Sequence, residues 1–170
     1  MVETGGTANL VHEVVRPDGT TVCFPNGNTE STCLLDANGE HRVLVKDDDG
    51  VQGGGYRIVL EKFPGPTGCD TVTVGGPVET GQVNLAGALA CLTFSGSAGD
   101  ETSFSATSTG GTWNPITDVV RTDGSTLCGP TFSDVFTCTL TTNGTHTVIL
   151  RDGAGTGAAT GSYALALDEV

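Results

Sequence analysis

Hydrophobic and polar residues alternate in several short stretches of this chain. In the sequence EHRVLVKD, Val43 and Val45 would point to one face of an extended strand, with polar residues between them. The later sequence THTVILRD repeats this pattern with Val148 and Leu150. No stretch carries a 3.6-residue hydrophobic stripe long enough to predict a sizeable helix. The pattern therefore predicts an all-β protein built from short strands.

Two further stretches follow Gly-rich loops and alternate in the same way. They are GYRIVL at 55–60 and SYALAL at 162–167, and each predicts a strand that ends one half of the chain.

Two segments of the chain repeat one another in sequence. A shift of 105 residues aligns 4–50 with 109–155 without a gap, and 22 of the 47 aligned pairs are identical. Identical Asp-Gly and Asn-Gly pairs punctuate both copies, and such pairs predict type I′ hairpin turns, in which both central residues have positive φ. These pairs are Asp18-Gly19, Asn38-Gly39, Asp123-Gly124 and Asn143-Gly144.

Only the second copy has an upstream part, which adds the strands LTFSG and ETSFSAT and the turn SAGD. The complete unit would hold about seven or eight short strands, which is typical of an antiparallel sandwich. We therefore predict disulfide-stapled antiparallel β-sandwich repeats of the jelly-roll or immunoglobulin-like kind. Their expected bounds are 1–62 for a partial first repeat without its N-terminal half, 63–68 for a Pro/Gly linker, and 69–170 for a complete second repeat.

The partial first repeat leaves three interpretations open, because Met1 aligns with Ala106, inside a strand of the complete copy. The chain could be an excerpt of a longer tandem array, the missing strands could come from a neighbouring subunit, or the first 63 residues could fold alone in another way. A segment of that size is near the lower limit for an independent core, which counts against the third interpretation.

The six cysteines follow the repeat. Cys23 and Cys33 match Cys128 and Cys138, whereas Cys69 and Cys91 lie only in the upstream part. The pairing that respects the repeat joins Cys23 to Cys33, Cys128 to Cys138 and Cys69 to Cys91. Disulfides imply an oxidising compartment. A zinc site is disfavoured, because no Cys-x-x-Cys occurs and the histidines are not spaced to complete one.

The net charge is −13, from 20 acidic and 7 basic residues. Such a surface repels the phosphate backbone, so we expect no nucleic acid among the partners. No stretch reaches the roughly 18 apolar residues of a membrane span, so we expect no membrane insertion.

The second copy resembles a known family in the order of its motifs: CLTFSGSAGDETSFSAT, then VVRTDGSTLC, then TNGTHTVILRDGAGTG, then GSYALAL. It is similar to the bacterial pre-peptidase C-terminal (PPC-like) domain family over 69–170, and over 1–62 only in the second half of the pattern. His41 and His146 stand where that family more often has Tyr, and the cysteines are additional. The resemblance implies a β-sandwich of secreted or surface proteins, often in tandem beside a hydrolase, without catalytic activity of its own.

Candidate chemistry is sparse. Asp47, Asp48 and Asp49 could bind Ca²⁺, although a solvated turn is the simpler interpretation because the second copy keeps only Asp152. The recurring histidines could mark a metal or pH-sensing position, but a strand residue copied with its unit explains them more simply.

Three further features complete the prediction. Asn143-Gly144-Thr145 is a glycosylation sequon on an exposed turn. Trp113 could line a carbohydrate-binding face, although one aromatic makes a poor platform and a core position is favoured. No Gly-x-Ser-x-Gly elbow or free thiol indicates nucleophilic catalysis, so we expect no enzyme and no cofactor apart from the Ca²⁺ candidate.

The sequence thus predicts a non-catalytic module outside the cell or on its surface, which acts as a structural element of an array or filament. Its partners would be copies of itself or adjacent repeats of a longer chain, joined by strand complementation between subunits. The alternative is an accessory module of a secreted hydrolase that binds Ca²⁺, glycan or protein.

Overall fold

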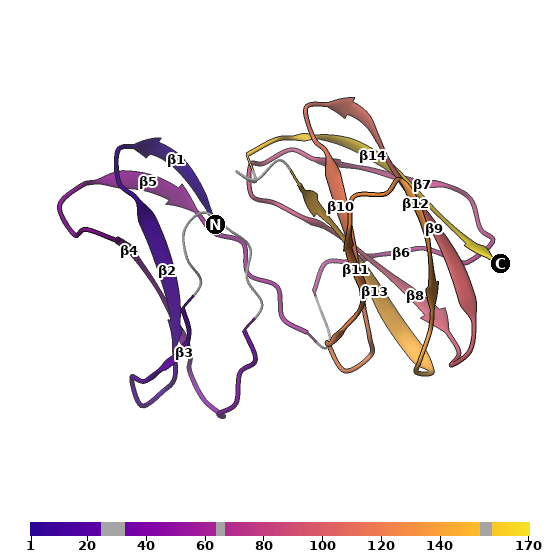
Figure 1. Ribbon diagram of the computed structural model, residues 1–170, viewed down its shortest axis with the longest axis horizontal. Coiled ribbons are helices and arrows are strands. Elements are labelled where there is room, and N and C mark those ends of the chain that lie inside the picture. The colour runs from indigo at the N-terminus through magenta and orange to yellow at the C-terminus, as the bar shows by residue number, and fades with distance from the viewer. Residues whose placement is uncertain (25–32, 64–66, 154–157) are drawn as a thin grey trace. The chain divides into compact units, whose positions relative to one another are not determined.

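The structure is a computed structural model that describes residues 1–24, 33–63, 67–153 and 158–170. Its described residues form fourteen β-strands and no helix, so the predicted all-β class is confirmed (Figure 1). The chain divides into two compact units, of which the first is Met1–Ile58 and the second holds the described residues from Val59 onward. Part of the predicted linker, 64–66, lies outside the described residues.

The second unit is a sandwich of two sheets. The five-stranded sheet has the order β11 (Thr126–Thr131), β10 (Pro115–Val120), β13 (Gly144–Asp152), β8 (Ala90–Gly96), β6 (Asp70–Thr71). The four-stranded sheet has the order β12 (Val135–Thr139), β9 (Glu101–Gly111), β14 (Gly161–Glu169), β7 (Glu79–Val83). All pairs are antiparallel except β6 with β8.

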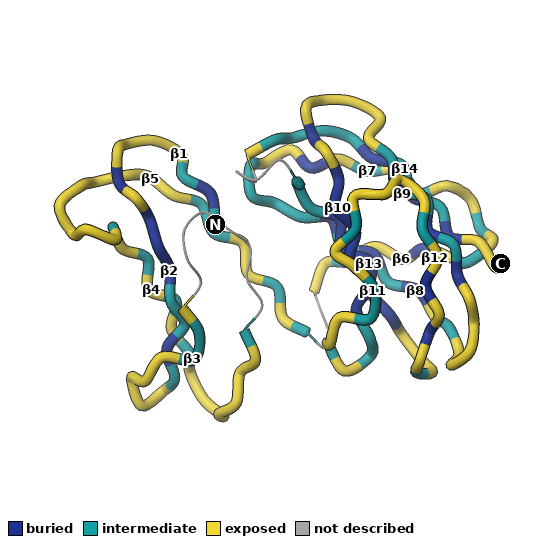
Figure 2. Tube along the Cα trace, viewed as in Figure 1, coloured by how far each residue is buried: buried dark blue, intermediate teal, exposed yellow. Residues whose placement is uncertain are grey.

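Alternating residues of the two sheets meet in the core of this unit (Figure 2). Leu92 of β8 and Val148 of β13 come from one sheet, and Phe104 of β9 and Leu165 of β14 come from the other. Phe94 packs edge-on against Phe104 with ring centroids 5.6 Å apart. Strand alternation alone therefore explains which side chains are buried, because successive residues of a strand point to opposite faces.

The first unit has the same kind of strands but fewer of them. A two-stranded sheet pairs β1 (Val2–Gly6) with β5 (Gly54–Arg57), and a three-stranded sheet has the order β3 (Thr21–Cys23), β2 (Leu10–Val15), β4 (Arg42–Asp47).

Both units pair their strands in the same register. In the first unit Leu10 of β2 lies opposite Asp47 of β4, as Pro115 lies opposite Asp152 in the second. The pairing of β1 with β5 likewise reproduces that of β9 with β14, including an irregularity at the glycines of β1 and β9. Residue positions can therefore be transferred from one unit to the other.

The first unit has two sheet edges without a described partner strand. β13 lies between β10 and β8, whereas its counterpart β4 pairs only with β2 among the described strands. β14 lies between β9 and β7, whereas its counterpart β5 pairs only with β1. The described strands of the first unit thus lack equivalents of β6, β7, β8 and β12.

The missing partners also shorten one strand. We predicted a strand over 55–60, but β5 ends at Arg57. In the second unit, the corresponding end of β14 pairs with residues 102–106 of β9, and the described first unit has no equivalent of that stretch. Hydrophobic alternation was therefore not enough to form a strand where the pairing groups are absent.

The Asp-Gly hairpins differ from the type I′ prediction. Gly19 and Gly124 have φ of +86° and +89°, but no described residue other than glycine has positive φ, so type I′ is wrong at all four predicted turns. The Gly19 amide donates to the Arg16 carbonyl at 2.9 Å, and the Arg16 amide donates to the Thr20 carbonyl at 2.7 Å. This is the longer hairpin loop in which a type I turn precedes a left-handed glycine.

A carboxylate closes each of these hairpins. Asp18 accepts hydrogen bonds from the Thr20 amide and hydroxyl at 2.9 and 2.7 Å, and Asp123 accepts the same pair from Ser125 at 2.9 and 2.6 Å. The hydroxyl bond, followed by the amide bond, lowers the pKa of both carboxyl groups.

The lowered pKa predicts an acid-sensitive contribution to stability. A carboxyl group whose pKa is depressed by folding stabilises the protein above its unfolded pKa and loses that effect as the pH falls through the folded pKa. We therefore expect Asp123→Ala to lower the melting temperature at neutral pH, and the difference from the parent chain to shrink at a pH below the ordinary aspartate pKa of about 3.9. Melting curves read from Trp113 fluorescence measure this, and an equal difference at both pH values would contradict it.

Candidate functional site

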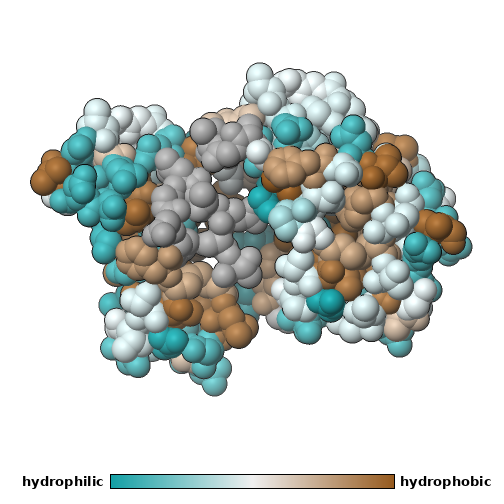
Figure 3. All heavy atoms as spheres, in the orientation of Figure 1, coloured by the Kyte–Doolittle hydropathy of each residue, from teal (hydrophilic) through white to brown (hydrophobic). Residues whose placement is uncertain are grey.

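Core positions of the second unit become surface positions in the first. Leu140 is 1% exposed and its counterpart Leu35 is 48% exposed, although both are leucine. Tyr163 and Tyr56 likewise differ, at 5% and 51%. Hydrophobic residues accordingly reach the surface of the first unit in the space-filling view (Figure 3). The first unit thus presents a face that the second unit covers with its own strands.

β8 and the turn that follows it lie against Leu140 in the second unit, and β7 lies against Tyr163. β8 pairs with β13 from Ala90 opposite Leu150 to Gly96 opposite Gly144. Within that pairing, the Phe94 ring stacks on the His146 ring with centroids 5.4 Å apart. β8 therefore pairs along the edge of β13 and places Phe94 on the His146 ring.

The turn after β8 is tied to the sandwich by three hydrogen bonds. The Leu140 amide donates to the Asp100 carbonyl and the Gly99 amide donates to the Leu140 carbonyl, each at 2.8 Å. The Ala98 amide donates to Oδ1 of Asn143 at 2.7 Å.

The first unit has the same four residues at the positions that contact β8 and its turn in the second. Leu35, Asn38, His41 and Val43 correspond to Leu140, Asn143, His146 and Val148. We name these four residues of the first unit the docking face. Sequence reasoning noted the histidines and the sequon but did not connect them, because only the register of β13 and β8 shows their common neighbour.

The two histidines share one hydrogen bond and differ in the other. Nδ1 of His41 lies 3.2 Å from the Gly39 carbonyl, and Nδ1 of His146 lies 3.1 Å from the Gly144 carbonyl. Nε2 of His146 lies 3.3 Å from the Thr142 hydroxyl, but position 37 is alanine in the first unit. Nε2 of His41 is buried and has no hydrogen-bond partner among the described residues.

The outer face of β4 is basic. Arg42 forms an exposed ion pair with Glu40 at 3.3 Å, and the Lys46 ammonium lies 5.3 Å from the centre of the Phe24 ring. Leu44 stands between these basic residues and is 43% exposed. One face of β4 therefore carries Val43 and Val45, and the other carries Leu44 between the two basic residues.

The loop that carries the docking face is held by an arginine. Nε and Nη2 of Arg16 donate to the two carboxylate oxygens of Asp36 at 2.8 Å each, which lowers the pKa of that carboxyl group. In the second unit Nε of Arg121 donates to the Thr141 hydroxyl at 3.0 Å. The two hydrogen bonds from Arg16 to Asp36 therefore hold the segment next to Leu35 and do not involve the Leu35 side chain.

Each unit is cross-linked internally, by one disulfide in the first unit and two in the second, and the predicted disulfide-stapled fold is confirmed. They join Cys23 to Cys33, Cys69 to Cys91 and Cys128 to Cys138, and the described residues contain no free cysteine. Disulfides form and persist in oxidising compartments, so the protein is placed outside the cytoplasm.

The first residue of the acidic run, Asp47, holds the loop that follows β4. Asp47 accepts hydrogen bonds from the amides of Asn9, Val51 and Gln52 at 2.8 to 2.9 Å, which lower the pKa of its carboxyl group. Asp48 and Asp49 are exposed. Across the described residues, no group of three or more His, Cys, Asp or Glu could hold a metal ion. Asp47 therefore stabilises the loop that follows β4.

Two other predicted features lie in the second unit. Trp113 is 3% exposed and tilts against Tyr163 with ring centroids 5.8 Å apart, so it belongs to the core. Asn143 is exposed, as a glycosylation site requires, but its Oδ1 is engaged by the turn after β8.

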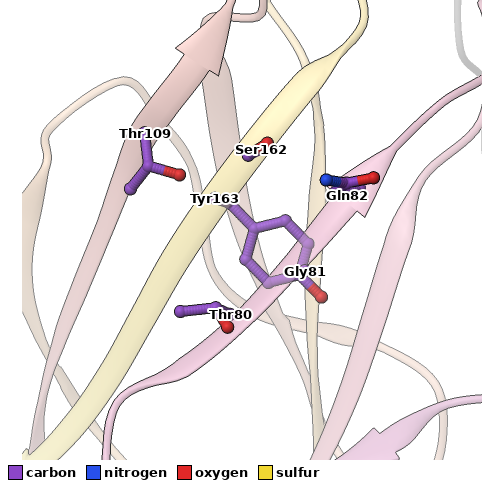
Figure 4. A pocket seen from close by; sticks show the side chains of 6 residues that line it. All are labelled: Thr80, Gly81, Gln82, Thr109, Ser162 and Tyr163. Carbon is purple, nitrogen blue, oxygen red and sulfur yellow. The ribbon is translucent and has the colours of Figure 1, made fainter.

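A pocket of about 290 Å³ opens on the four-stranded sheet of the second unit. Figure 4 shows the Tyr163 ring lying beside Gly81, where any larger residue would collide with the Tyr163 hydroxyl. Burial, with Asp70 and Glu79, raises the pKa of Tyr163, so the phenol stays protonated at neutral pH. The lining offers hydroxyl and amide groups but no carboxylate or imidazole: Thr80, Gly81, Gln82, Thr109, Ser162 and Tyr163.

Comparisons with known proteins do not assign a family. No protein-family model matches the chain, and no curated protein matches it. Among solved structures, the pre-peptidase C-terminal domain of a Bacillus anthracis collagenase is 10% identical, with a TM-score of 0.47 over 60% of this chain and 96% of that one. PliG of Salmonella Typhimurium, a periplasmic inhibitor of g-type lysozyme, is 13% identical, with a TM-score of 0.41 over 59% and 99%. PliG of Aeromonas hydrophila is 14% identical, with a TM-score of 0.39 over 58% and 97%.

No helix in the described part of the chain is long and apolar enough to cross a membrane.

Proposed function

We propose that the chain is a non-catalytic, extracellular structural module of a cell-surface array or filament, in which strands of a neighbouring molecule complete the first unit. The observation that carries this proposal is the exposure of residues whose counterparts form the core of the second unit, with Leu35 at 48% against Leu140 at 1%. Unpaired strand edges and exposed apolar faces recruit other chains.

The energetics support association through this face. Leu35 is 48% exposed, and full burial of a leucine side chain contributes about 1.5–3 kcal/mol. Pairing along β4 would add main-chain hydrogen bonds, which is how an added strand gains affinity. The disulfides and the acidic surface suit a module that works outside the cell.

The alternative function is an accessory module of a secreted hydrolase. The hydroxyl and amide lining of the pocket beside Tyr163 favours it, because such groups bind glycan or peptide. A melting temperature that rises with Ca²⁺ or with an oligosaccharide would support this function instead.

The test of the structural role is the association state of the oxidised, full-length chain. We expect light scattering on a sizing column and negative-stain microscopy to show oligomers or filaments that grow with protein concentration. Leu35→Asp should abolish them, whereas the control Val78→Asp, at an exposed apolar position of the second unit, should leave them unchanged. A monodisperse monomer at all concentrations would overturn the structural role.

A further inference from the structure

We infer that the docking face binds a strand-and-turn segment of a neighbouring molecule, with the residue pattern of Ala90–Asp100, in the register that β8 takes on β13. This inference rests on the proposed function and names its partner segment. The second unit shows what covers such a face, since all four docking-face residues are identical to the residues that hold β8 and its turn.

The register fixes the apolar side chains of the occupant. Phe94 lies opposite His146 and Leu92 lies opposite Val148. Transferred to the first unit, an aromatic residue of the occupant stacks on His41, and an aliphatic residue two positions earlier lies opposite Val43. The occupant runs antiparallel to β4.

The occupant needs a small residue two positions after the aromatic one. Gly96 lies against the Leu140 side chain, and any Cβ at Gly96 would collide with it. Leu35 has the same side chain at the corresponding place, so a glycine of the occupant fits there without any movement of Leu35. Beyond it, a backbone amide of the turn donates to Oδ1 of Asn38, as the Ala98 amide does to Asn143.

One difference between the units distinguishes the occupant from β8 itself. Arg42 stands where Thr147 faces Thr93 in the second unit. A carboxylate opposite Arg42 gives a favourable cross-strand pair, so this outward position of the occupant is acidic.

The chain's own segment of this pattern is already paired within the second unit. The occupant is therefore a second segment of the same kind and not the resident β8.

The experiment uses the full-length oxidised chain and a synthetic peptide of residues 88–102 in which Cys91→Ser prevents disulfide exchange. We expect the labelled peptide to bind in a one-to-one ratio by fluorescence anisotropy, and to slow amide hydrogen exchange in β4 but not in β13. Thr93→Glu in the peptide should tighten binding and Thr93→Lys should weaken it, each by about two- to fivefold at low salt. Phe94→Ala should weaken it by at least about tenfold.

The repeat provides a matched control in the protein. Asn38→Ala should weaken peptide binding by about fivefold to tenfold, because it removes one hydrogen bond of the turn. Asn143→Ala should lower the melting temperature of the second unit and leave peptide binding unchanged. A peptide that fails to bind, or binds equally well when scrambled or to the Asn38→Ala variant, overturns the inference.

These outcomes separate the inference from the proposed function. Specific peptide binding by a chain that never associates supports the docking face and overturns the filament role. Association that an excess of peptide does not inhibit overturns the inference and leaves the structural role standing.

Discussion

Replacing Leu140 with alanine is expected to lower the free energy of unfolding of the second unit by about 2–5 kcal/mol, the usual cost of truncating a fully buried leucine. The matched change, Leu35→Ala, is expected to alter the stability of the first unit by less than about 0.5 kcal/mol, as at exposed positions. The two residues are identical and occupy equivalent positions, but they are 1% and 48% exposed. The contrast therefore isolates the effect of the strands that cover Leu140.

Two probes follow the two units separately. Trp113 is the only tryptophan and lies in the core of the second unit, so its fluorescence during denaturant unfolding reports that unit. Amide hydrogen exchange of β2 and β4 reports the first unit. Equal losses for Leu35→Ala and Leu140→Ala at low protein concentration would show that the first unit buries Leu35 in solution.

Much of the fold could be predicted from the sequence, because strands leave a local signal. The alternation of Val43 and Val45 predicted β4, and the repeat predicted both the sandwich of the second unit and the pairing of the cysteines. These features depend on residues near one another or on positions related by the repeat.

Two sequence predictions were wrong, the end of β5 and the turn type of the hairpins. The first depends on pairing with a distant strand, and the second on a residue pair that fits two kinds of turn. Ile58 and Leu60 continue the alternation of β5, but the strand ends at Arg57 where the partner stretch is absent from the described unit. Asp18-Gly19 fits both type I′ and the longer type I loop, and the hydrogen bonds of Arg16 distinguish them. Sequence pairs of this kind identify a hairpin more reliably than its geometry.

The sequence alone indicated only part of the docking face. Asn143 was interpreted as a sequon, but Asn38 is followed by Gly39-Glu40 and is not one. Asparagine at both positions therefore indicated a shared structural role, which the bond from the Ala98 amide to Asn143 explains. The unpartnered Nε2 of His41 required coordinates, because it depends on the burial of one atom.

Supplying the missing strands within the same chain is expected to convert the first unit into a complete sandwich. The alignment places Met1 at the position of Ala106, so a second copy of residues 69–105, fused ahead of the chain with Met1→Ala, continues the register into β1. We expect amide exchange in β4 to slow by at least about a hundredfold, since its edge becomes an interior position of a sheet. Peptide binding and concentration-dependent association should both disappear, because the docking face is then occupied.

The control for this fusion keeps its length and disrupts its fit. Changing the added copies of Leu92 and Phe94 to aspartate places charges where the docking face presents Val43 and His41, so neither protection nor loss of association is expected. Unchanged exchange of β4 in the intact fusion would contradict the transfer of register from the second unit to the first. Full protection without loss of association would place the assembly contact elsewhere on the chain. The fusion therefore tests the completed sandwich and the assembly role with one protein, through two independent measurements.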